Sequence, residues 1–244
     1  MYSCECQVGE CVLCEAHLFS GLSGEQVCSM QSLIFKRSYE AGTLIFQAGE
    51  PGIRLYILKS GQVKLTTSLP DGREQILGVR VAGHLLGFES VEDKVYPYSA
   101  QAVTPVEVCT IKFSSMMRVL EHNPEVSIKV IRLLNNEIER SQALIRDLGL
   151  KSANEKVASF ILSLVPLNGD IPDKIALPLT RQEIASMLGL TVETVSRVMA
   201  EMKRNRIIEA PRGAVVISDP QRLRIMAGIK PDPGSGERAV GGLR

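Results

Sequence analysis

Residues 180–199 of this 244-residue chain, TRQEIASMLGLTVETVSRVM, constrain the fold more than any other segment. Thr180 and Glu183 have the spacing of a capping box, which starts a helix through two reciprocal hydrogen bonds. Gly189 can take the left-handed conformation that ends such a helix. Thr191 is a good N-cap for a second helix. The order of these signals predicts two short helices bent about a glycine.

Apolar residues indicate how the two helices pack. Ile184 and Leu188 lie four residues apart on one face of the first helix, and Ala185 is small enough for a close crossing. Val195 and Val198 point inward from the second helix. Polar residue types are left on the outer face of the second helix.

That outer face matches the chemistry of base edges in DNA. Arginine can bond guanine in bidentate fashion, glutamate can accept from cytosine, and serine adapts to either. The segment therefore predicts a DNA-binding helix-turn-helix. The alternative is an ordinary helical hairpin in a core, which does not require this order of caps, small residue and glycine. The candidate DNA contacts are Gln182, Thr191, Val192, Glu193, Ser196, Arg197, Lys203 and Arg204.

The sequence after the second helix supports this prediction. Residues 203–206, KRNR, place three positive charges where a phosphate backbone would pass. Two short apolar runs, 207–210 and 214–217, then flank the turn signal of residues 211–213. Together these features predict a winged helix-turn-helix.

Charge is distributed unevenly along the chain. Residues 1–150 carry 14 basic and 17 acidic side chains, a net charge of −3, whereas residues 151–228 carry 11 and 8, a net charge of +3. The positive excess therefore coincides with the predicted DNA-binding region, as phosphate binding requires.

Composition indicates a cytoplasmic globular protein. The hydrophobic fraction of 45% and charged fraction of 23% are ordinary for such proteins, and the length suits two modest domains. No run approaches the roughly 18 to 20 apolar residues of a membrane span, and the start lacks a signal-peptide pattern. In a reducing compartment, the six cysteines favour metal or redox chemistry over structural disulfides.

The middle of the chain predicts an antiparallel β-roll. Short β-rich runs separated by glycines cover residues 44–46, 55–58, 63–67, 75–81 and 106–111. Asp71 and Gly72 form the plainest hairpin turn among them.

A long helix follows. Asn123 supplies a cap, Pro124 suits the first helical position, and no helix breaker occurs before Gly149. A heptad spacing within it predicts a partner helix and hence a homodimer, whose two recognition helices would read two DNA half-sites. The alternative is a helix that packs on its own roll. The seam comprises Ile131, Leu134, Ile138, Ser141, Ile145 and Leu148.

The predicted architecture is therefore α+β, with five parts. They are a cysteine-rich segment (1–32), an antiparallel β-roll sensor domain (33–122), a dimerisation helix (123–149), a winged helix-turn-helix domain (150–228) and a disordered tail (229–244). Where the third part meets the fourth, residues 149–153 are expected to form a hinge that leads into a helix over 154–164.

This order of parts resembles the cyclic-AMP receptor and FNR (CRP/FNR) superfamily of bacterial transcription regulators over about residues 14–228. The matching motifs are GTLIF at 42–46, Gly49-Glu50, Tyr56, GQV at 61–63 and GLTVETVSR at 189–197. The resemblance implies a cyclic-nucleotide-binding-like roll, no enzymatic activity, and an RNA polymerase contact at loop 68–74, which a solvated turn explains equally well.

Two positions argue against cyclic-nucleotide sensing. Cyclic-AMP binders hold the ribose and phosphate with a Gly-Glu pair and an Arg-Ser pair, where this chain has Gly87-Phe88 and Tyr98-Ser99. Without the arginine, a cyclic phosphate lacks its bidentate partner. Val192 before Glu193, with Ser196 and Arg197, resembles instead the FNR pattern, which implies a TTGAT-like half-site in an inverted repeat.

The FNR branch also implies an oxygen-sensing [4Fe-4S] cluster held by four thiolates. Its ligands would be Cys6, Cys11, Cys14 and Cys109, with Cys4 as an alternative N-terminal ligand. The spacing departs from that of enteric FNR proteins, which have gaps of two and then five residues. Here the gaps are four and two. A structural zinc on Cys4, Cys6, Cys11 and Cys14, or a regulator that senses nitric oxide, haem or thiol oxidation, is the alternative.

The expected mechanism couples the cluster to dimerisation. Glu137 and Glu139 flank the seam, and their repulsion would hold cluster-free subunits apart. Cys28 is expected in a core, and the histidines, His84 among them, at the surface or in caps. An enzyme that uses the cysteines lacks support, because no cysteine has a histidine and acid pattern nearby.

Overall fold

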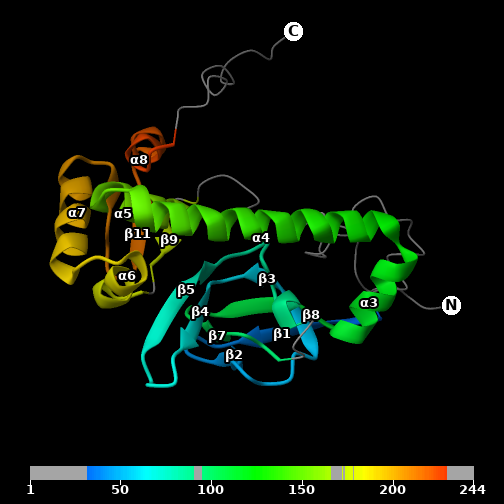
Figure 1. Ribbon diagram of the computed structural model, residues 1–244. Helices are drawn as coiled ribbons and strands as arrows, with labels where there is room; N and C mark the ends of the chain where they lie inside the picture. Colours follow the sequence, from blue (N-terminus) through cyan, green and yellow to red (C-terminus); the bar gives the residue numbers. More distant parts are fainter. Residues whose placement is uncertain (1–31, 91–94, 166–171, 173, 178, 230–244) are drawn as a thin grey trace, which may run out of the picture.

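The computed structural model describes residues 32–90, 95–165, 172, 174–177 and 179–229 (Figure 1). A β-rich part comes first, with β1 (Ile34–Tyr39), β2 (Leu44–Phe46), β3 (Arg54–Ser60), β4 (Val63–Ser68), β5 (Glu74–Arg80), β6 (Leu85–Leu86), the 3-10 turn η1 (Phe88–Ser90), β7 (Ser99–Ala102) and β8 (Val106–Lys112). The helices α3 (Phe113–His122), α4 (Pro124–Leu150) and α5 (Ala153–Ser163) follow. The chain continues through β9 (Ile175–Ala176), α6 (Arg181–Leu188), α7 (Val192–Arg204), β10 (Ile208–Glu209), β11 (Ala214–Ile217) and α8 (Pro220–Met226).

The strands form the predicted antiparallel roll from two four-stranded sheets. Their strand orders are β1-β8-β3-β6 and β2-β7-β4-β5. The turn between β4 and β5 forms as predicted, with Gly72 at φ 85° and the Leu69 N–H donating to the Arg73 carbonyl at 2.9 Å. Sequence patterns missed β1, whose central residues are all exposed, and β7, whose sequence SAQA has small residues and little β propensity.

Aromatic side chains fill the interior of the roll. The rings of Phe46 and Tyr96 stack with centroids 4.0 Å apart, and Tyr56 and Tyr98 pack beside them. All four side chains are buried. Such a core is stabilised by the large apolar area of each ring.

The long helix α4 lies along the roll and joins it to the second part of the molecule (Figure 1). Pro124 occupies its first turn, as predicted, but the side chain of Asn123 makes no capping hydrogen bond and donates instead to the Val119 carbonyl of α3 at 2.9 Å. Gly149 stays within the helix, because a single glycine costs only about 1 kcal/mol there. The hinge before α5 is therefore residues 151–152, shorter than expected.

Four helices and a three-stranded sheet of order β10-β11-β9 form the second part. A core cluster joins α5, α6 and α7, and Ile76 and Val79 of β5 belong to the same cluster. The roll and the second part therefore share buried contacts. Among the described residues, no helix has both the length and the apolar composition needed to cross a membrane.

Candidate DNA interface, dimer face and cysteine site

The first helix of the predicted helix-turn-helix is capped as its sequence indicates. Thr180 Oγ1 accepts from the Glu183 N–H at 3.2 Å, and Glu183 Oε2 accepts from the Thr180 N–H at 2.8 Å. Gly189 ends this helix at φ 62°, and Thr191 Oγ1 accepts from the Thr194 N–H at 3.2 Å to start α7. The helix-turn-helix geometry is thus fixed by local hydrogen bonds.

The two helices cross through the apolar residues predicted to point inward. Ile184, Ala185 and Leu188 of α6 are buried, as are Val195 and Val198 of α7. The helix α7 lies at the outer edge of the molecule, away from the roll and α4 (Figure 1). Its outer face is therefore open to a macromolecule as large as duplex DNA.

Most of the candidate base-reading residues lie on that open face. Glu193, Ser196 and Arg197 are exposed, and so are Thr191 and Gln182. Hydrogen bonds from its own backbone N–H and from Thr191 hold the pKa of Glu193 below its ordinary value, so its carboxylate stays an acceptor at neutral pH.

Val192 differs from the other candidates. It is half-buried and packs against the core cluster of the second part, so only part of its side chain can meet a base. The first turn of α7 therefore both anchors the helix and presents its polar residues.

Exposed cations surround the end of α7 and the wing. Lys203 and Arg204 are exposed in its last turn. The turn between β10 and β11 exposes Arg212 beside Gly213, which has φ 71°. Sequence reasoning identified this turn but assigned no role to Arg212, although a cation at the tip of a wing is placed to meet phosphate.

Cys109 is the one candidate thiolate ligand among the described residues, because Cys4, Cys6, Cys11, Cys14 and also Cys28 lie outside them. It is buried in β8, paired in register with Ile57 of β3 and Lys36 of β1. It belongs to a core cluster with Val126 and Val130, which lie in the first two turns of α4. Sequence spacing alone gives no indication that a strand cysteine lies beside the long helix.

Two observations concern whether the residues present could hold a cluster at Cys109. No group of three or more histidine, cysteine, aspartate or glutamate side chains in the described part of the chain is arranged to hold a metal, so a cluster at Cys109 would need ligands from outside that part. Leu33 and Ile34, near the start of the described residues, pack against the same core cluster as Cys109. Nineteen residues separate Cys14 from Ile34. An extended chain of that length spans about 60 Å, which is enough for the N-terminal thiols to reach Cys109.

The candidate dimer face is largely exposed. Ile131, Ile138, Ile145 and Leu148 keep 63%, 56%, 72% and 38% of their surface, and Ser141 is also exposed. Ile128, which the heptad reading did not include, continues this row at 51%. Leu134 differs, because it is half-buried against the core cluster that contains Cys109. The row of exposed aliphatic residues is of the kind that a second helix covers.

The prediction that an uncompensated Glu137 repels a second subunit across the seam is wrong. Its carboxylate accepts from Arg80 of β5 and lies 3.9 Å from the guanidinium of Arg140. The side chain is half-buried on the roll side of α4, where these two cations compensate its charge. Only Glu139 is exposed, and it accepts a hydrogen bond from Asn135 at 2.8 Å.

His84 also differs from expectation, because it is buried under α4. Its Nδ1 lies 2.8 Å from the Val81 carbonyl, and its Nε2 contacts Arg140. Burial and the adjacent Arg140 lower the pKa of His84 to about 3, so the ring is neutral at physiological pH.

Comparison with known proteins agrees with this architecture. Residues 36–123 match the cyclic nucleotide-binding domain family, and residues 155–226 match the Crp-like helix-turn-helix domain family. The chain therefore belongs to the CRP/FNR family, whose members are DNA-binding, dimeric transcription regulators and not enzymes.

Individual relatives place it near the FNR-named members. It is 30% identical to the fumarate and nitrate reduction regulatory protein of Yersinia pestis over 93% of this chain and 92% of that protein. It is 31% identical to the transcriptional activator protein anr of Pseudomonas aeruginosa over 90% and 91%. The solved structure of FixK2 from Bradyrhizobium japonicum has a TM-score of 0.69 and 28% identity, and covers 79% of this chain and 96% of that one.

Proposed function

We propose that this regulator senses oxygen through a [4Fe-4S] cluster held by Cys109 and three of the N-terminal cysteines. Cys6, Cys11 and Cys14 are the preferred set, with Cys4 as the alternative. A bound cluster would be the group that reacts with oxygen. The position of Cys109 carries the proposal, because a group held there lies against the helix expected to form the dimer.

The protein's own residues would couple ligand binding to dimerisation through packing. Cys109 shares one buried cluster with Val126 and Val130, and α4 carries the exposed seam on another face. A change in how tightly the start of α4 packs would therefore alter the angle of this helix or the order of its seam residues. This route replaces the expected charge repulsion, because Glu137 is already ion-paired.

The dimer would present two copies of α7 to a TTGAT-like inverted repeat. Arg197 and Glu193 would specify bases, with Ser196, Val192, Thr191 and Gln182 at neighbouring positions. Lys203 and Arg204 would contact phosphates. Leu69, exposed in the turn after β4, marks the loop proposed to contact RNA polymerase.

We also propose that the roll does not sense a cyclic nucleotide. Tyr98, at the place of the family's arginine, is buried and donates to Glu89 Oε2 at 2.9 Å, and Phe88, at the place of the family's glutamate, is also buried. Burial raises the pKa of Tyr98, so it stays a neutral donor and offers no charge to a phosphate.

Anaerobic reconstitution tests the oxygen-sensing proposal. Iron, acid-labile sulfide and the ultraviolet-visible spectrum would be measured before and after exposure to air, together with the dimer fraction and operator affinity. We expect the cluster to raise both the dimer fraction and operator affinity, and air to reverse both. Equal DNA binding with and without iron would contradict the proposal.

Two single-cysteine variants sharpen the test. Cys109→Ser should lose the cluster, whereas Cys28→Ser should keep it, because Cys28 is outside the proposed ligand set. If Cys109→Ser instead keeps a full complement of metal as zinc, the N-terminal cysteines hold a structural site and Cys109 is a core residue.

A further inference from the structure

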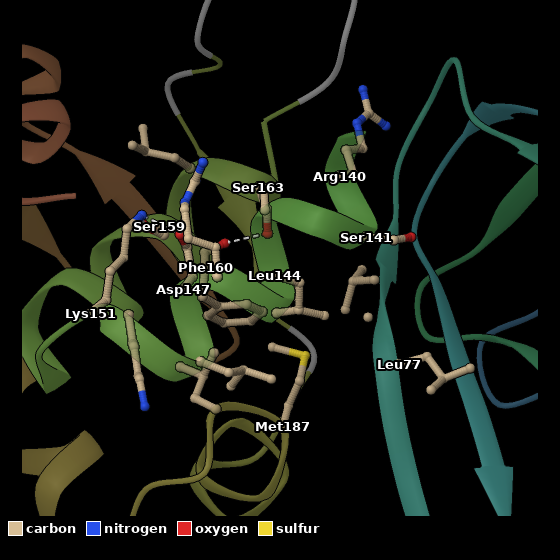
Figure 2. A pocket seen from close by; sticks show the side chains of 18 of the residues that line it. Leu77, Arg140, Ser141, Leu144, Asp147, Lys151, Ser159, Phe160, Ser163 and Met187 are labelled. Carbon is tan, nitrogen blue, oxygen red and sulfur yellow. Dashed lines mark hydrogen bonds and ion pairs between the residues drawn. The ribbon is translucent and has the colours of Figure 1, made fainter. Parts of the chain in front are cut away.

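A cavity of about 460 Å³ lies where the three parts of the chain meet (Figure 2). One wall is β5 of the roll, a second is the C-terminal half of α4, and the third comes from α5 and α6 of the DNA-binding part. Its volume falls in the range of small-molecule sites, roughly 300 to 1,000 Å³. It is separate from the interior of the roll, which aromatic rings fill.

The floor of the cavity is apolar. Leu144 of α4, Phe160 of α5 and Met187 of α6 converge in its middle, with Leu77 of β5 across from them (Figure 2). Phe160 and Met187 are each 5% exposed, so they form a fixed surface, whereas Leu77 is 37% exposed at the rim. An apolar body of modest size is the complement of this floor.

The rim of the cavity is strongly basic. Its charged lining residues are Arg80, Arg140, Arg146, Lys151, Lys156 and Asp147. Asp147 is paired with Lys151 at 2.6 Å and with Arg146 at 3.0 Å, and Glu137 beside the cavity pairs with Arg80 and Arg140. Glu155 also interacts with Lys151, so three carboxylates lie among five cations, and the neutral His84 adds no charge.

Lys156 is the clearest uncompensated cation. No described carboxylate lies within salt-bridge distance of its ammonium group. Lys151 differs, because its Nζ donates both to Asp147 and to Ser159 Oγ at 2.6 Å. The net positive charge over an apolar floor is complementary to an anion that carries an apolar group.

We propose that this cavity binds a small amphipathic organic anion, a carboxylate, sulfonate or phosphate attached to a compact apolar body. The ligand would touch the roll, α4 and the helix-turn-helix at once. It would therefore stabilise one placement of the DNA-binding part relative to the roll, independently of any cluster.

A fluorescence titration with 8-anilinonaphthalene-1-sulfonate tests the proposal on the full-length, cluster-free protein. We expect saturable binding of one probe per chain. Decanoate should displace the probe, whereas decanol at the same concentration should not, because decanol has the apolar body without the charge. Displacement by both to the same extent would overturn the proposal, as would binding that does not saturate.

Variants locate the site. Leu144→Trp should abolish saturable binding by filling the cavity, and Lys156→Gln should weaken it about three- to tenfold by removing the unpaired charge. Lys112→Gln, an exposed cation on the far end of β8, serves as the matched control and should bind the probe unchanged. Lys156→Gln is the decisive variant if Leu144→Trp unfolds the protein. Unchanged affinity in Lys156→Gln would overturn the proposal.

A further arm tests whether the chain itself fills the cavity. Ile229 contributes to the lining and is followed by residues 230–244. We expect a chain that ends at Ile229 to bind the probe like the full-length protein. If truncation tightens binding by tenfold or more, the tail is the occupant and the proposed small anion is wrong.

Discussion

His84 occupies a position where protonation would be unfavourable. Its Nδ1 can donate to the Val81 carbonyl while Nε2 accepts from Arg140, which describes a neutral ring. A proton on Nε2 would place two cations side by side in a buried site. Because the pKa of His84 falls to about 3 in the fold and is about 6.5 in an unfolded chain, the unfolded state binds the proton first as pH falls.

We therefore expect acid to destabilise the fold through His84. Between pH 7 and pH 5 the free energy of unfolding should fall by about 1 to 2 kcal/mol on account of this residue, since stability is lost as pH falls below the unfolded pKa. Urea unfolding of the cluster-free protein at the two pH values measures the fall. His84→Gln, neutral throughout, should show a fall smaller by this amount, and identical pH dependence in both proteins would refute the expectation.

Arg197 and Lys203 should differ in how they affect DNA binding. Arg197→Ala should cost about 1 to 3 kcal/mol on the intact operator and reduce discrimination against a changed base pair, because it removes a base contact. Lys203→Ala should weaken binding to all DNA sequences alike. It should also reduce the slope of the logarithm of the binding constant against the logarithm of salt concentration by about one. Binding to matched operators at several salt concentrations measures both. Sequence-selective loss in Lys203→Ala would contradict these roles.

At the scale of elements, α4 serves two surfaces at once. One face packs on the roll through Val126, Val130 and the ion-paired Glu137, and another exposes the aliphatic row. Ile138 lies near the centre of that row and is 56% exposed. The same 27-residue helix can therefore report on the roll while it binds a second copy.

Ile138→Ala should accordingly weaken the dimer without unfolding the subunit. Each dimer would lose two partly buried side chains, so the dissociation free energy should fall by about 1 to 3 kcal/mol. Sedimentation equilibrium measures the change, and thermal unfolding checks the subunit. Arg132→Ala, exposed on α4 but away from the row, is the control. Equal weakening by both variants would argue against this face.

At the scale of the whole molecule, the roll contacts the helix-turn-helix directly. Lys64 of β4 donates to Glu183 Oε1 at 2.7 Å, and Gln62 Nε2 donates to the Ala176 carbonyl of β9 at 2.9 Å. Burial raises the pKa of Glu183, but Lys64 and Thr180 outweigh it and the pKa is lowered overall. Glu183 thus caps α6 and also joins α6 to the roll.

A double-mutant cycle can separate these two roles. Lys64→Gln and Glu183→Gln, alone and together, should give a coupling energy of about 1 kcal/mol in denaturant unfolding, because the pair is partly buried. Glutamine at position 183 still completes the capping box. The cycle of Lys59→Gln and Glu107→Gln, a more exposed pair at 3.9 Å, should give a coupling near zero. Equal coupling energies in the two cycles would show that the ion pair between Lys64 and Glu183 adds no stability beyond that of an exposed pair.

The sequence alone predicted the features that depend on residues close together along the chain. The cap at Thr180, the left-handed Gly189 and the turn at Gly72 form because each depends on hydrogen bonds within a few residues. The period of the long helix likewise predicted an exposed apolar row. Gly149 and Asn123 show the limit of such reasoning, because helix continuation and a tertiary hydrogen bond override the local preferences.

The sequence by itself thus determined the order of elements, the helix-turn-helix with its polar face and the presence of a cysteine-rich start. Only the tertiary structure decided that Glu137 pairs with Arg80, that His84 is buried, that Cys109 lies beside α4, and that residues of the roll, α4, α5 and α6 line one basic cavity. The physical reason is distance along the chain. Caps and periodicity depend on residues within one or two turns. The four tertiary features instead depend on residues that become neighbours only when the roll, α4 and the DNA-binding part pack together.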